Sequence, residues 1–287
     1  MWFGNGFLPD NENLKVINGD VRDQEAFKTV CEGQDAIIYL ASISNNEMER
    51  KNHDLFYQVN QYSFMPNVIS AKEAGVKRFI YASSVAAYGS TIEDAKETDT
   101  LKPTTAYGHS KAYGEYALMH YRSPEFCCTV VRSASVCGYS PAQRFDTPVN
   151  AMAHDGVRTG IIKVNGGEQK RSHISIKDIA DFYRLLLKAP VAQINGEAFN
   201  AVLANQSILD TAGTVAEAIG GAVIVKKERT DDRSYTADWH KAREVLGFAP
   251  KCSVYRAAKD LAVRLKNGQW QDSLSNSHYM KMADGLA

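Results

Sequence analysis

The stretch Arg78-Phe-Ile-Tyr-Ala-Ser-Ser84 decides how this chain folds. Phe79 to Ala82 are apolar or aromatic without interruption, and two hydroxyl residues close the run. Short runs of this kind are typical of parallel strands that are buried on both faces. Open α/β sheets bind their ligands beyond the carboxyl ends of such strands. The pattern therefore predicts a buried strand with Ser84 at the edge where a substrate would lie.

Downstream of this strand, the chain continues to Tyr107-Gly-His-Ser-Lys111. A tyrosine and a lysine four residues apart lie on the same face of a helix, one turn from each other. A free phenol has a pKa near 10, so a tyrosine base at neutral pH needs a pKa lowered by roughly 3 units, about 4 kcal/mol. Nearby positive charge is the usual means. The segment therefore predicts that Tyr107 is an acid/base and that Lys111 assists it.

The spacing alone does not identify the site, because Tyr255 and Lys259 repeat it. Upstream of Tyr107 stands the buried strand that ends in Ser84. Upstream of Tyr255 no comparable strand is predicted. We therefore interpret Tyr255 and Lys259 as a pair on a helix surface.

Composition limits the classes of function. The 287 residues are 44% hydrophobic and 23% charged, with a formal net charge of zero. Balanced charge predicts neither nucleic acid nor an anionic membrane as a partner. No apolar run approaches the length of a membrane span, and the first residues lack the pattern of a signal peptide. The five cysteines are odd in number and without Cys-x-x-Cys spacing, which predicts reduced thiols in a cytoplasmic protein and no metal site.

Strands and helices are predicted to alternate along the chain. Expected strands are residues 14–18, 36–41, 78–84 and 128–132. Expected helices are residues 24–33, 54–75 with a break near Pro66, 179–188 with Asp178 as its N-cap, 238–246 and 254–267. Such alternation is typical of an α/β fold with a parallel sheet and helices on both faces.

Two segments together resemble a known family. Phe79-Ile-Tyr-Ala-Ser-Ser-Val-Ala-Ala-Tyr-Gly89 and Tyr107-Gly-His-Ser-Lys111 resemble the extended short-chain dehydrogenase/reductases, in particular the branch of nucleotide-sugar epimerases and dehydratases. The resemblance extends from Leu14 to about Leu265. It implies a Rossmann-like, doubly wound sheet in residues 1–140 and a smaller α/β substrate-binding part in residues 141–287, with some of its segments returning to the sheet.

The resemblance also implies roles for individual residues. Tyr107 would be the acid/base, Lys111 would lower its pKa and hold the nicotinamide ribose, and Ser84 would bond to the reacting sugar hydroxyl. The implied cofactor is NAD, with NADP not excluded. Its expected contacts, besides Tyr107 and Lys111, are Asp20 and Val21 near the adenine, then Leu40, Ala41, Ser42, Asn60, Ala82, Ser83, Ala134, Ser135 and Val136. For Asn60, a purely structural hydrogen-bonding role remains open.

The same resemblance implies a nucleotide-diphospho-sugar as the substrate. Arg144 and Asn150 would meet it, although this segment could equally be a helix start capped by Asp146 or Thr147. Arg171 and Arg233 would bind the nucleotide and its diphosphate, because guanidinium groups meet phosphate oxygens in a bidentate manner. An exposed arginine without a functional contact is the alternative for each.

One family feature is absent from the sequence. Members begin with a strand, a Gly-x-x-Gly-x-x-Gly turn and a helix, whose backbone approaches the cofactor pyrophosphate. No such turn occurs here, since Gly4-Asn-Gly6 lacks a third glycine at the required offset. In the strand order 3-2-1-4-5-6, the strand at residues 14–18 would then lack its neighbours. The sequence leaves open whether the chain is a piece of a longer protein or whether this strand pairs elsewhere.

The residues at and after Ser84 indicate the reaction. Family dehydratases carry Thr-Asp-Glu where this chain has Ser84-Val85-Ala86, and a family reductase that also epimerises has cysteine in place of Ala86. The expected reaction is therefore epimerisation through a 4-keto intermediate, with a C4 dehydrogenase or reductase as the alternative. A catalytically inactive or partner-dependent truncated scaffold is the alternative of another class. The family further implies a homodimer that packs through the Tyr107 helix, where Ala112, Gly114 and Ala117 are small.

Overall fold

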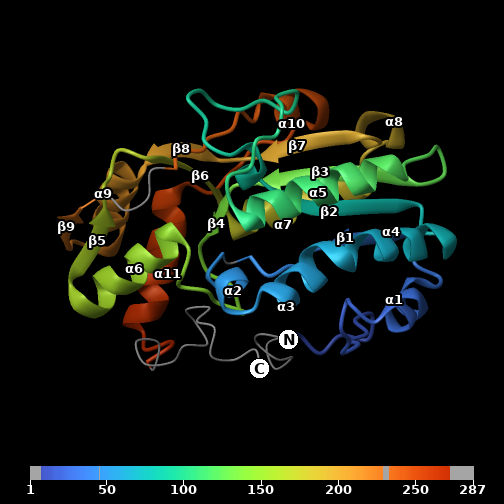
Figure 1. The fold of residues 1–287 in the computed structure, drawn as a ribbon. Coiled ribbons are helices and arrows are strands. Elements are labelled where there is room, and N and C mark those ends of the chain that lie inside the picture. Colours follow the sequence, from blue (N-terminus) through green and yellow to red (C-terminus); the bar gives the residue numbers. More distant parts are fainter. Residues whose placement is uncertain (1–7, 45, 229–232, 272–287) are drawn as a thin grey trace.

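A four-stranded parallel sheet forms the centre of the molecule (Figure 1). The computed structural model describes residues 8–44, 46–228 and 233–271. The strands follow the order β1-β2-β3-β7. Their bounds are Ala36–Tyr39 for β1, Arg78–Ser84 for β2, Cys127–Ser133 for β3 and Glu197–Ala201 for β7. The predicted strands at residues 36–41, 78–84 and 128–132 are confirmed, each within two residues of its expected ends.

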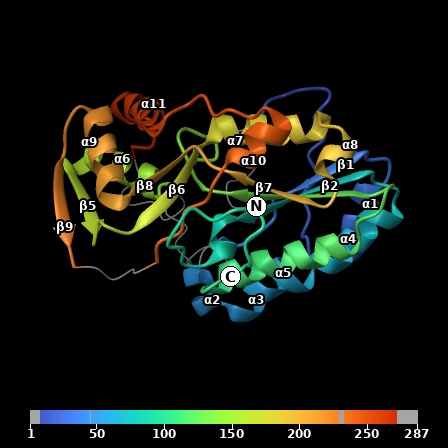
Figure 2. The ribbon, with the colours of Figure 1, turned by 90° about the horizontal axis from the view of Figure 1, so that it is seen from above.

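Helices cover both faces of this sheet because successive side chains of a strand point to opposite sides. Phe79 and Tyr81 pack on one face of the sheet, whereas Ile80 packs on the other, and both layers belong to the main core. Figure 2 shows the helices on either side of the sheet. One side carries α1 (Gln24–Cys31), α4 (Phe64–Glu73) and α5 (Ala106–His120), and the other carries α7 (Ile176–Lys188), α8 (Val191–Ile194) and α10 (His240–Leu246). The predicted doubly wound α/β fold is confirmed.

A second, smaller core lies at the left of Figure 1. It centres on Phe145, Val149, Val215 and Leu261. Its helices are α6 (Pro148–Thr159), α9 (Ile208–Ile219) and α11 (Val254–Lys266). One small sheet contains β4 (Ser135–Cys137), β6 (Lys170–Ser175) and β8 (Ala204–Ser207), and the other contains β5 (Ile161–Asn165) and β9 (Val223–Lys227). The domain boundary at residue 140 stays a prediction.

The segment predicted as one helix over residues 54–75 consists of several pieces. It begins within α3 (His53–Tyr57), which follows the separate helix α2 (Asn46–Lys51), and a π-helical turn (Gln58–Tyr62) leads into α4. The break precedes Pro66, which lies in the first turn of α4, where a missing backbone N–H leaves no helical hydrogen bond unmade. Among the described residues, none of these helices has the length and apolarity needed to cross a membrane.

The prediction of a strand at residues 14–18 is wrong. This segment forms no strand, and Leu14, Val16 and Ile17 are each more than 40% exposed. In the described part of the chain, β1 pairs only with β2, so no strand lies beside residues 14–18. A strand needs a neighbour to satisfy its backbone N–H and C=O groups. The apolar pattern of residues 14–18 therefore does not produce a strand without a neighbouring strand.

The predicted N-cap of α7 is also wrong. Ser175 is the N-cap, and its Oγ accepts a hydrogen bond from the Asp178 backbone N–H at 3.0 Å. The Ser175 hydroxyl donates in return to Asp178 Oδ2 at 2.7 Å. Asp178 thus occupies the third helical position, and it also accepts the N–H groups of Lys251 and Cys252. Its carboxylate fastens the start of α11 to α7.

Candidate active site

A cavity of 520 Å³ opens at the carboxyl ends of β2 and β3. Ser84 is the last residue of β2 and Ser133 is the last residue of β3, and both line this first cavity. Tyr107, near the start of α5, lines it as well. The structure therefore brings together Ser84 and Tyr107, as expected for side chains beyond parallel strand ends.

Local chemistry fixes the start of α5 beside Ser84. The Thr105 hydroxyl accepts a hydrogen bond from the Gly108 N–H at 3.0 Å and caps the helix. A Cβ on Gly108 would lie 2.6 Å from the carbonyl oxygen of Ala86, in the 3₁₀ turn after Ser84. Only glycine permits this approach. As a result, the Tyr107 phenol hydrogen-bonds with Ser84.

A second cavity of 390 Å³ adjoins the first. Leu40, Ser42, Ala82, Ser83 and Lys111 line it, all of them predicted cofactor contacts. Several residues line both cavities: Ser44, Tyr107, Ser133, Val136, Arg144 and Thr147. Tyr107 thus lies in the wall between two spaces, one bordered by Ser84 and the other by Lys111.

The Lys111 ammonium is held inside the protein. Lys111 is 3% exposed, and its Nζ donates a hydrogen bond to the Ala82 carbonyl at 2.7 Å. Nζ lies 5.5 Å from the centre of the Tyr107 ring and 5.0 Å from that of Tyr81. Burial lowers the pKa of Lys111 to about 7, and the negative charge of Glu115 opposes this effect.

Burial shifts the pKa of Tyr107 in the opposite direction to that of Lys111. It raises the pKa of the phenol to about 12, while the positive charge of Arg144 and the hydrogen bond with Ser84 oppose the rise. The causes that lower the Tyr107 pKa here are Arg144 and Ser84, so the expectation that Lys111 lowers it stays a prediction. Lys111 is itself desolvated and lies closer to the Tyr81 ring. The cation that favours the phenolate is Arg144.

Two polar partners hold Arg144 in the shared wall. Its Nε and Nη2 each lie 2.8 Å from one carboxylate oxygen of Asp146, a bidentate pair. Nη1 donates to the Ser44 hydroxyl at 3.2 Å. Thr147 is the N-cap of α6 but makes no side-chain capping bond. Asp146 therefore serves Arg144 and not the helix start.

The other predicted arginines occupy different positions. Arg233 lines the first cavity, next to Tyr235. Arg171 is buried at 5% exposure and does not line that cavity. Its guanidinium lies 4.4 Å above the Tyr235 ring and donates to the carbonyl groups of Lys170 and Arg233. Arg171 supports the segment that carries Arg233, and this geometry gives no support to a direct contact of Arg171 with substrate.

Two predicted asparagines bond to the main chain. Asn150 Oδ1 accepts the Gly138 N–H at 2.8 Å, and Nδ2 donates to the Arg144 carbonyl at 3.0 Å. Asn60 binds the N–H and C=O groups of Ile43 at 2.7 and 2.9 Å. Both amides hold loops at the rim of the second cavity. The structural role left open for Asn60 therefore has direct support.

The remaining cofactor predictions divide into two groups. Ala134, Ser135 and Val136 line the first cavity. Asp20, Val21 and Ala41 line neither cavity. The exposed Asp20 carboxylate pairs with Arg22, which lowers the pKa of Asp20, and the Val21 carbonyl accepts from Asn67. The structure does not bring Asp20 and Val21 to the other predicted contacts.

Sequence reasoning missed Glu115, which lies one helical turn beyond Lys111 and is 4% exposed. The signal was present, because the spacing that joins Tyr107 to Lys111 also joins Lys111 to Glu115. Ser44, Tyr183 and Tyr235 were missed as well, and they line the cavities from loops or helices without a motif. No cluster of three His, Cys, Asp or Glu side chains suited to a metal ion occurs within the described ranges.

Comparison with known proteins identifies the family. A model of the NAD dependent epimerase/dehydratase family matches residues 6–201. The chain belongs to this family. The predicted resemblance is confirmed, and with it the expectation of an enzyme class that uses NAD or NADP.

Several members of the NAD dependent epimerase/dehydratase family resemble the chain over most of its length. The UDP-glucose 4-epimerase of Lacticaseibacillus casei is 26% identical over 260 residues, which are 82% of this chain and 78% of that protein. A UDP-glucose 4-epimerase from Thermotoga maritima, solved with UDP-glucose, superimposes with a TM-score of 0.77 at 22% identity and covers 90% of this chain and 86% of its own. A dTDP-glucose 4,6-dehydratase from Streptomyces venezuelae, solved with NAD, gives 0.79 at 20% identity, with coverages of 90% and 81%. The solved structures share the fold.

Proposed function

We propose that this protein is an NAD(P)-dependent epimerase that inverts C4 of a nucleotide-diphospho-sugar through a 4-keto intermediate. The observation that carries the proposal is the position of Tyr107 in the wall between two adjoining cavities. Ser84 borders one cavity and Lys111 the other. A proton-transfer group between a sugar space and a cofactor space is what reversible oxidation of a hydroxyl requires.

The second cavity fits the nicotinamide and ribose of a dinucleotide. Its residues Leu40 and Ala82 offer apolar surface, and the Lys111 ammonium and the Tyr107 hydroxyl offer donors to a ribose. NAD(P), when bound, supplies a ring that accepts and returns a hydride. Within the described ranges, no glycine-rich turn joins a strand to a helix as a cradle for the pyrophosphate.

The chain's own residues would divide the proton chemistry. Ser84 would hold the sugar hydroxyl against the Tyr107 oxygen, which takes the proton as the hydroxyl is oxidised. Arg144 would stabilise the phenolate state of Tyr107, which burial disfavours. The same phenol then returns the proton to the sugar oxygen when the ketone is reduced on its other face.

Epimerisation fits the first cavity better than elimination of water does. The two residues after Ser84 are Val85 and Ala86, and neither can act as an acid or base. Among the described residues that line this cavity, Asp146 is the single carboxylate, and Arg144 occupies both its oxygens. A dehydratase needs a free acid and a free base at this point.

Arg233 and Arg144 support a substrate with a diphosphate. Both residues line the first cavity, and an arginine side chain suits phosphate oxygens. Arg171 would act indirectly, by holding the Arg233 carbonyl and the Tyr235 ring. Asn150 would act in the same way through the loop of Arg144.

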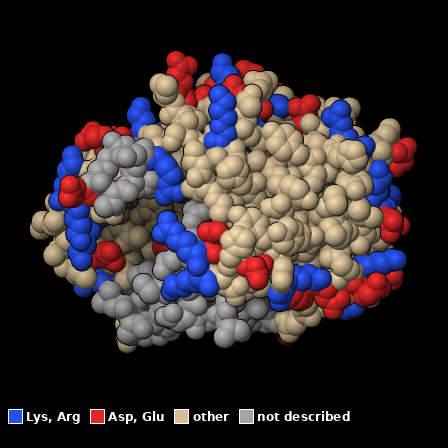
Figure 3. Space-filling view, in the orientation of Figure 1, with Lys and Arg blue, Asp and Glu red and all other residues tan. Residues whose placement is uncertain are grey.

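We also propose a homodimer that packs through α4 and α5. Tyr62, Met65 and Tyr116 are 63%, 39% and 64% exposed on or beside these helices. The charged residues of α5, Lys111 and Glu115, are both buried, and Figure 3 shows few charged side chains over the centre of this view. Gly114 is not part of that surface, because it faces Tyr81 of β2. Light scattering of Tyr116→Glu should give a monomer where the wild type gives a dimer.

A cytoplasmic location is proposed on the state of the cysteines. All five are free thiols, and four of them are buried. Fractionation of cells that produce the protein should recover it with the cytoplasmic enzymes. Recovery from the membrane or the exterior would contradict this location.

Cofactor binding followed by turnover tests the proposed function. The folded chain should bind NAD or NADP in a calorimetric titration and should interconvert a UDP- or dTDP-hexose with its C4 epimer, followed by NMR. Tyr107→Phe should abolish conversion. Tyr255→Phe is the matched control, because it removes the hydroxyl of the other Tyr-Lys pair, and it should keep full activity.

Three outcomes would replace the proposal. Stoichiometric accumulation of reduced cofactor without epimer would indicate a C4 dehydrogenase. Loss of water from the sugar would indicate a dehydratase. No binding of either dinucleotide up to millimolar concentration, by a folded sample, would indicate an inactive or partner-dependent scaffold.

A further inference from the structure

Lys111 and a buried carboxylate one helical turn later are both bound to strand β2. Lys111 and Glu115 lie one turn apart on α5, and both reach β2. Lys111 Nζ donates to the Ala82 carbonyl, and the next residue, Ser83, donates its hydroxyl to the Glu115 carboxylate. Two successive strand residues thus hold two successive turns of the helix. Sliding α5 along β2 would break both contacts at once.

Glu115 is also half of a buried ion pair. Arg132 of β3 donates from Nε and Nη2 to Glu115 Oε2 at 3.1 and 2.8 Å. The exposed fractions of the Arg132 and Glu115 side chains are 8% and 6%. The Arg132 guanidinium thus compensates the buried Glu115 carboxylate one helical turn from Lys111.

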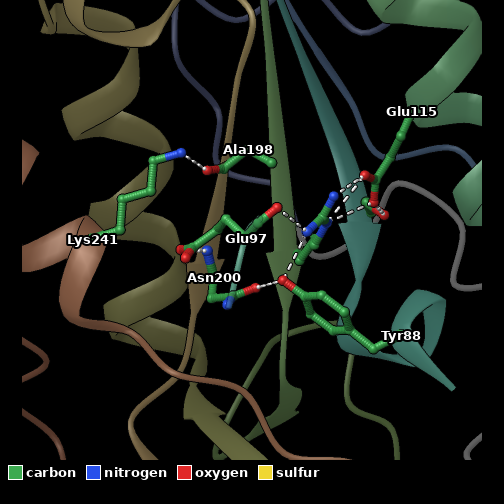
Figure 4. Close-up of polar contacts among 8 residues, drawn as sticks. Tyr88, Glu97, Glu115, Ala198, Asn200 and Lys241 are labelled. Carbon is green, nitrogen blue, oxygen red and sulfur yellow. Dashed lines mark hydrogen bonds and ion pairs between the residues drawn. The ribbon is translucent and has the colours of Figure 1, made fainter. Parts of the chain in front are cut away.

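Arg132 is held in place from other elements of the fold. Its Nη1 donates to the Tyr88 hydroxyl at 2.8 Å and to the Glu97 carbonyl at 3.1 Å. The Tyr88 hydroxyl donates in turn to Asn200 Oδ1 of β7 at 2.8 Å. Figure 4 shows Tyr88, Glu97 and Asn200 converging on one side of this cluster, with Glu115 on the other. Glu115 therefore has a partner that cannot move away.

The other groups that face Lys111 carry no negative charge at neutral pH. Tyr81 on β2, Tyr107 on α5 and Tyr183 on α7 are phenols whose pKa values burial raises. Arg144, on the loop before α6, lines the same cavity and is positive. Among the described residues, Glu115 is the one charged group that supports the protonated lysine against burial, beside the hydrogen bond to the Ala82 carbonyl.

We propose that Glu115 is a positioning residue: its carboxylate keeps the positive charge on Lys111 and locks α5 in register with β2. The catalytic part of this inference rests on the proposed function, whereas the charge and the register belong to the folded chain alone. Ser83 and Arg132 act through Glu115. The catalytic tyrosine and lysine thus depend on a carboxylate that does not line either cavity.

Titration of Lys111 itself tests the proposal. Protein labelled with ¹³C and ¹⁵N only in lysine would be titrated by NMR, with the Lys111 Cε signal assigned by its absence from Lys111→Met. In Glu115→Gln, the midpoint should move to lower pH by roughly one to two pH units, as expected for loss of a unit charge one helical turn away. The exposed Lys259 is the internal reference, and its midpoint should not move.

A second variant separates charge from folding. Glu115→Gln alone leaves Arg132 as an unpaired buried charge and could unfold the chain. Glu115→Gln with Arg132→Met removes both charges, as replacements of buried ion pairs by neutral side chains are often tolerated. The double variant should fold and should still show the lowered Lys111 midpoint. A folded double variant that titrates like the wild type would overturn the proposal, and so would an unchanged midpoint in a folded Glu115→Gln.

Turnover then separates this inference from the proposed function. If a substrate is found, the alkaline limb of the kcat profile, where Lys111 loses its positive charge, should move to lower pH in the double variant, together with the Lys111 midpoint. If no nucleotide sugar is converted while the Lys111 midpoint still moves, the proposed function fails and the role of Glu115 stands. If conversion occurs and the midpoint stays in place, the role of Glu115 fails alone.

Discussion

Two tyrosines of this protein carry a lysine one helical turn later, and the two pairs have nearly the same geometry. The lysine Nζ lies 5.5 Å from the ring centre of Tyr107 and 5.8 Å from that of Tyr255. Only Tyr107 stands at the carboxyl end of a parallel sheet, between two cavities. The surroundings of a side-chain pair, more than its spacing, decide whether it can do chemistry.

Arg144 should set the acid strength of Tyr107. In Arg144→Gln, the loss of the nearby positive charge raises the pKa of Tyr107 further, so less phenolate forms at a given pH. We expect kcat at pH 7 to fall about tenfold or more, since each pKa unit changes the phenolate fraction tenfold. The alkaline rise of the kcat profile should move to higher pH.

Arg144→Lys is the matched variant, because it keeps a positive charge but loses the bidentate pair with Asp146. It should retain more of kcat than Arg144→Gln does. If both variants raise KM alone and leave the kcat profile in place, Arg144 binds substrate without acting on Tyr107.

Lys111 should make stability depend on pH. The folded chain has a Lys111 pKa of about 7 against an ordinary value of 10.5. Between these two pH values the unfolded chain holds the proton and the folded chain does not, so the free energy of unfolding rises with pH. Below pH 7 the folded protein carries the full cost of a buried ammonium. Lys111→Met removes this cost, on the order of 2 to 4 kcal/mol.

Urea denaturation between pH 6 and pH 10 measures this dependence. The advantage of Lys111→Met over the wild type should be largest at pH 6 and should shrink towards pH 10. Lys259→Met, at an exposed position, provides the comparison and should follow the wild type. Parallel curves for Lys111→Met and the wild type would contradict the lowered pKa.

At the scale of elements, the packing of α5 on β2 leaves no room for a side chain at Gly114. A Cβ at this position would lie 2.4 Å from the Tyr81 hydroxyl oxygen, and Tyr81 is 2% exposed and cannot swing away. Gly114→Ala should destabilise the protein by about 1 to 3 kcal/mol, the usual cost of overpacking. Gly213 in α9 is the control, because a Cβ at that position would have nothing within 4 Å.

Gly213→Ala should stabilise the protein by roughly 0.5 to 1 kcal/mol through helix propensity alone. Thermal unfolding of the two variants should therefore show shifts of opposite sign. A stabilised Gly114→Ala would mean that α5 can move away from β2, which would also weaken the argument for a fixed register.

Elements were predictable where a local pattern sufficed. The apolar run before Ser84 predicts β2, and Thr105 before an uninterrupted helical segment gives α5 its cap. Residues 14–18 carry a strand pattern as well, but pairing depends on a neighbour far away in the sequence. The wrong N-cap of α7 has a local cause instead, because Ser175 and Asp178 are both capping residue types and the sequence does not tell which of them begins the helix.

The site residues, too, were predictable where a local motif marks them and not where their role depends on distant contacts. Ser84, Tyr107 and Lys111 belong to motifs, and the structure places them around two adjoining cavities. Arg171 belongs to a motif too, yet it faces Arg233 and Tyr235, since sequence does not tell which side of a strand faces a cavity. Arg132, buried between distant elements, has no motif that would reveal its partner.

At the scale of the whole molecule, the first cavity joins the two cores. Ser84 and Tyr107 come from elements of the main sheet, while Arg144 precedes α6 and Tyr235 comes after β9. The groups that would transfer protons therefore sit on one core, and the groups that would hold a diphosphate sit largely on segments leading to the other. In such an arrangement, substitutions that alter binding of the diphosphate can occur without altering the residues that transfer protons.

The order of the central strands has a consequence for local unfolding. In the described chain, β2 and β3 have a neighbour on each side, whereas β1 and β7 have one. Amide protons of β2 and β3 should exchange with solvent only through global opening, and those of β1, β5 and β9 should exchange faster through local fraying. The Ala82 carbonyl and Ser84 would then belong to the part of the protein that opens last. We expect the smaller core to loosen and admit a substrate while the distances around Tyr107 stay unchanged.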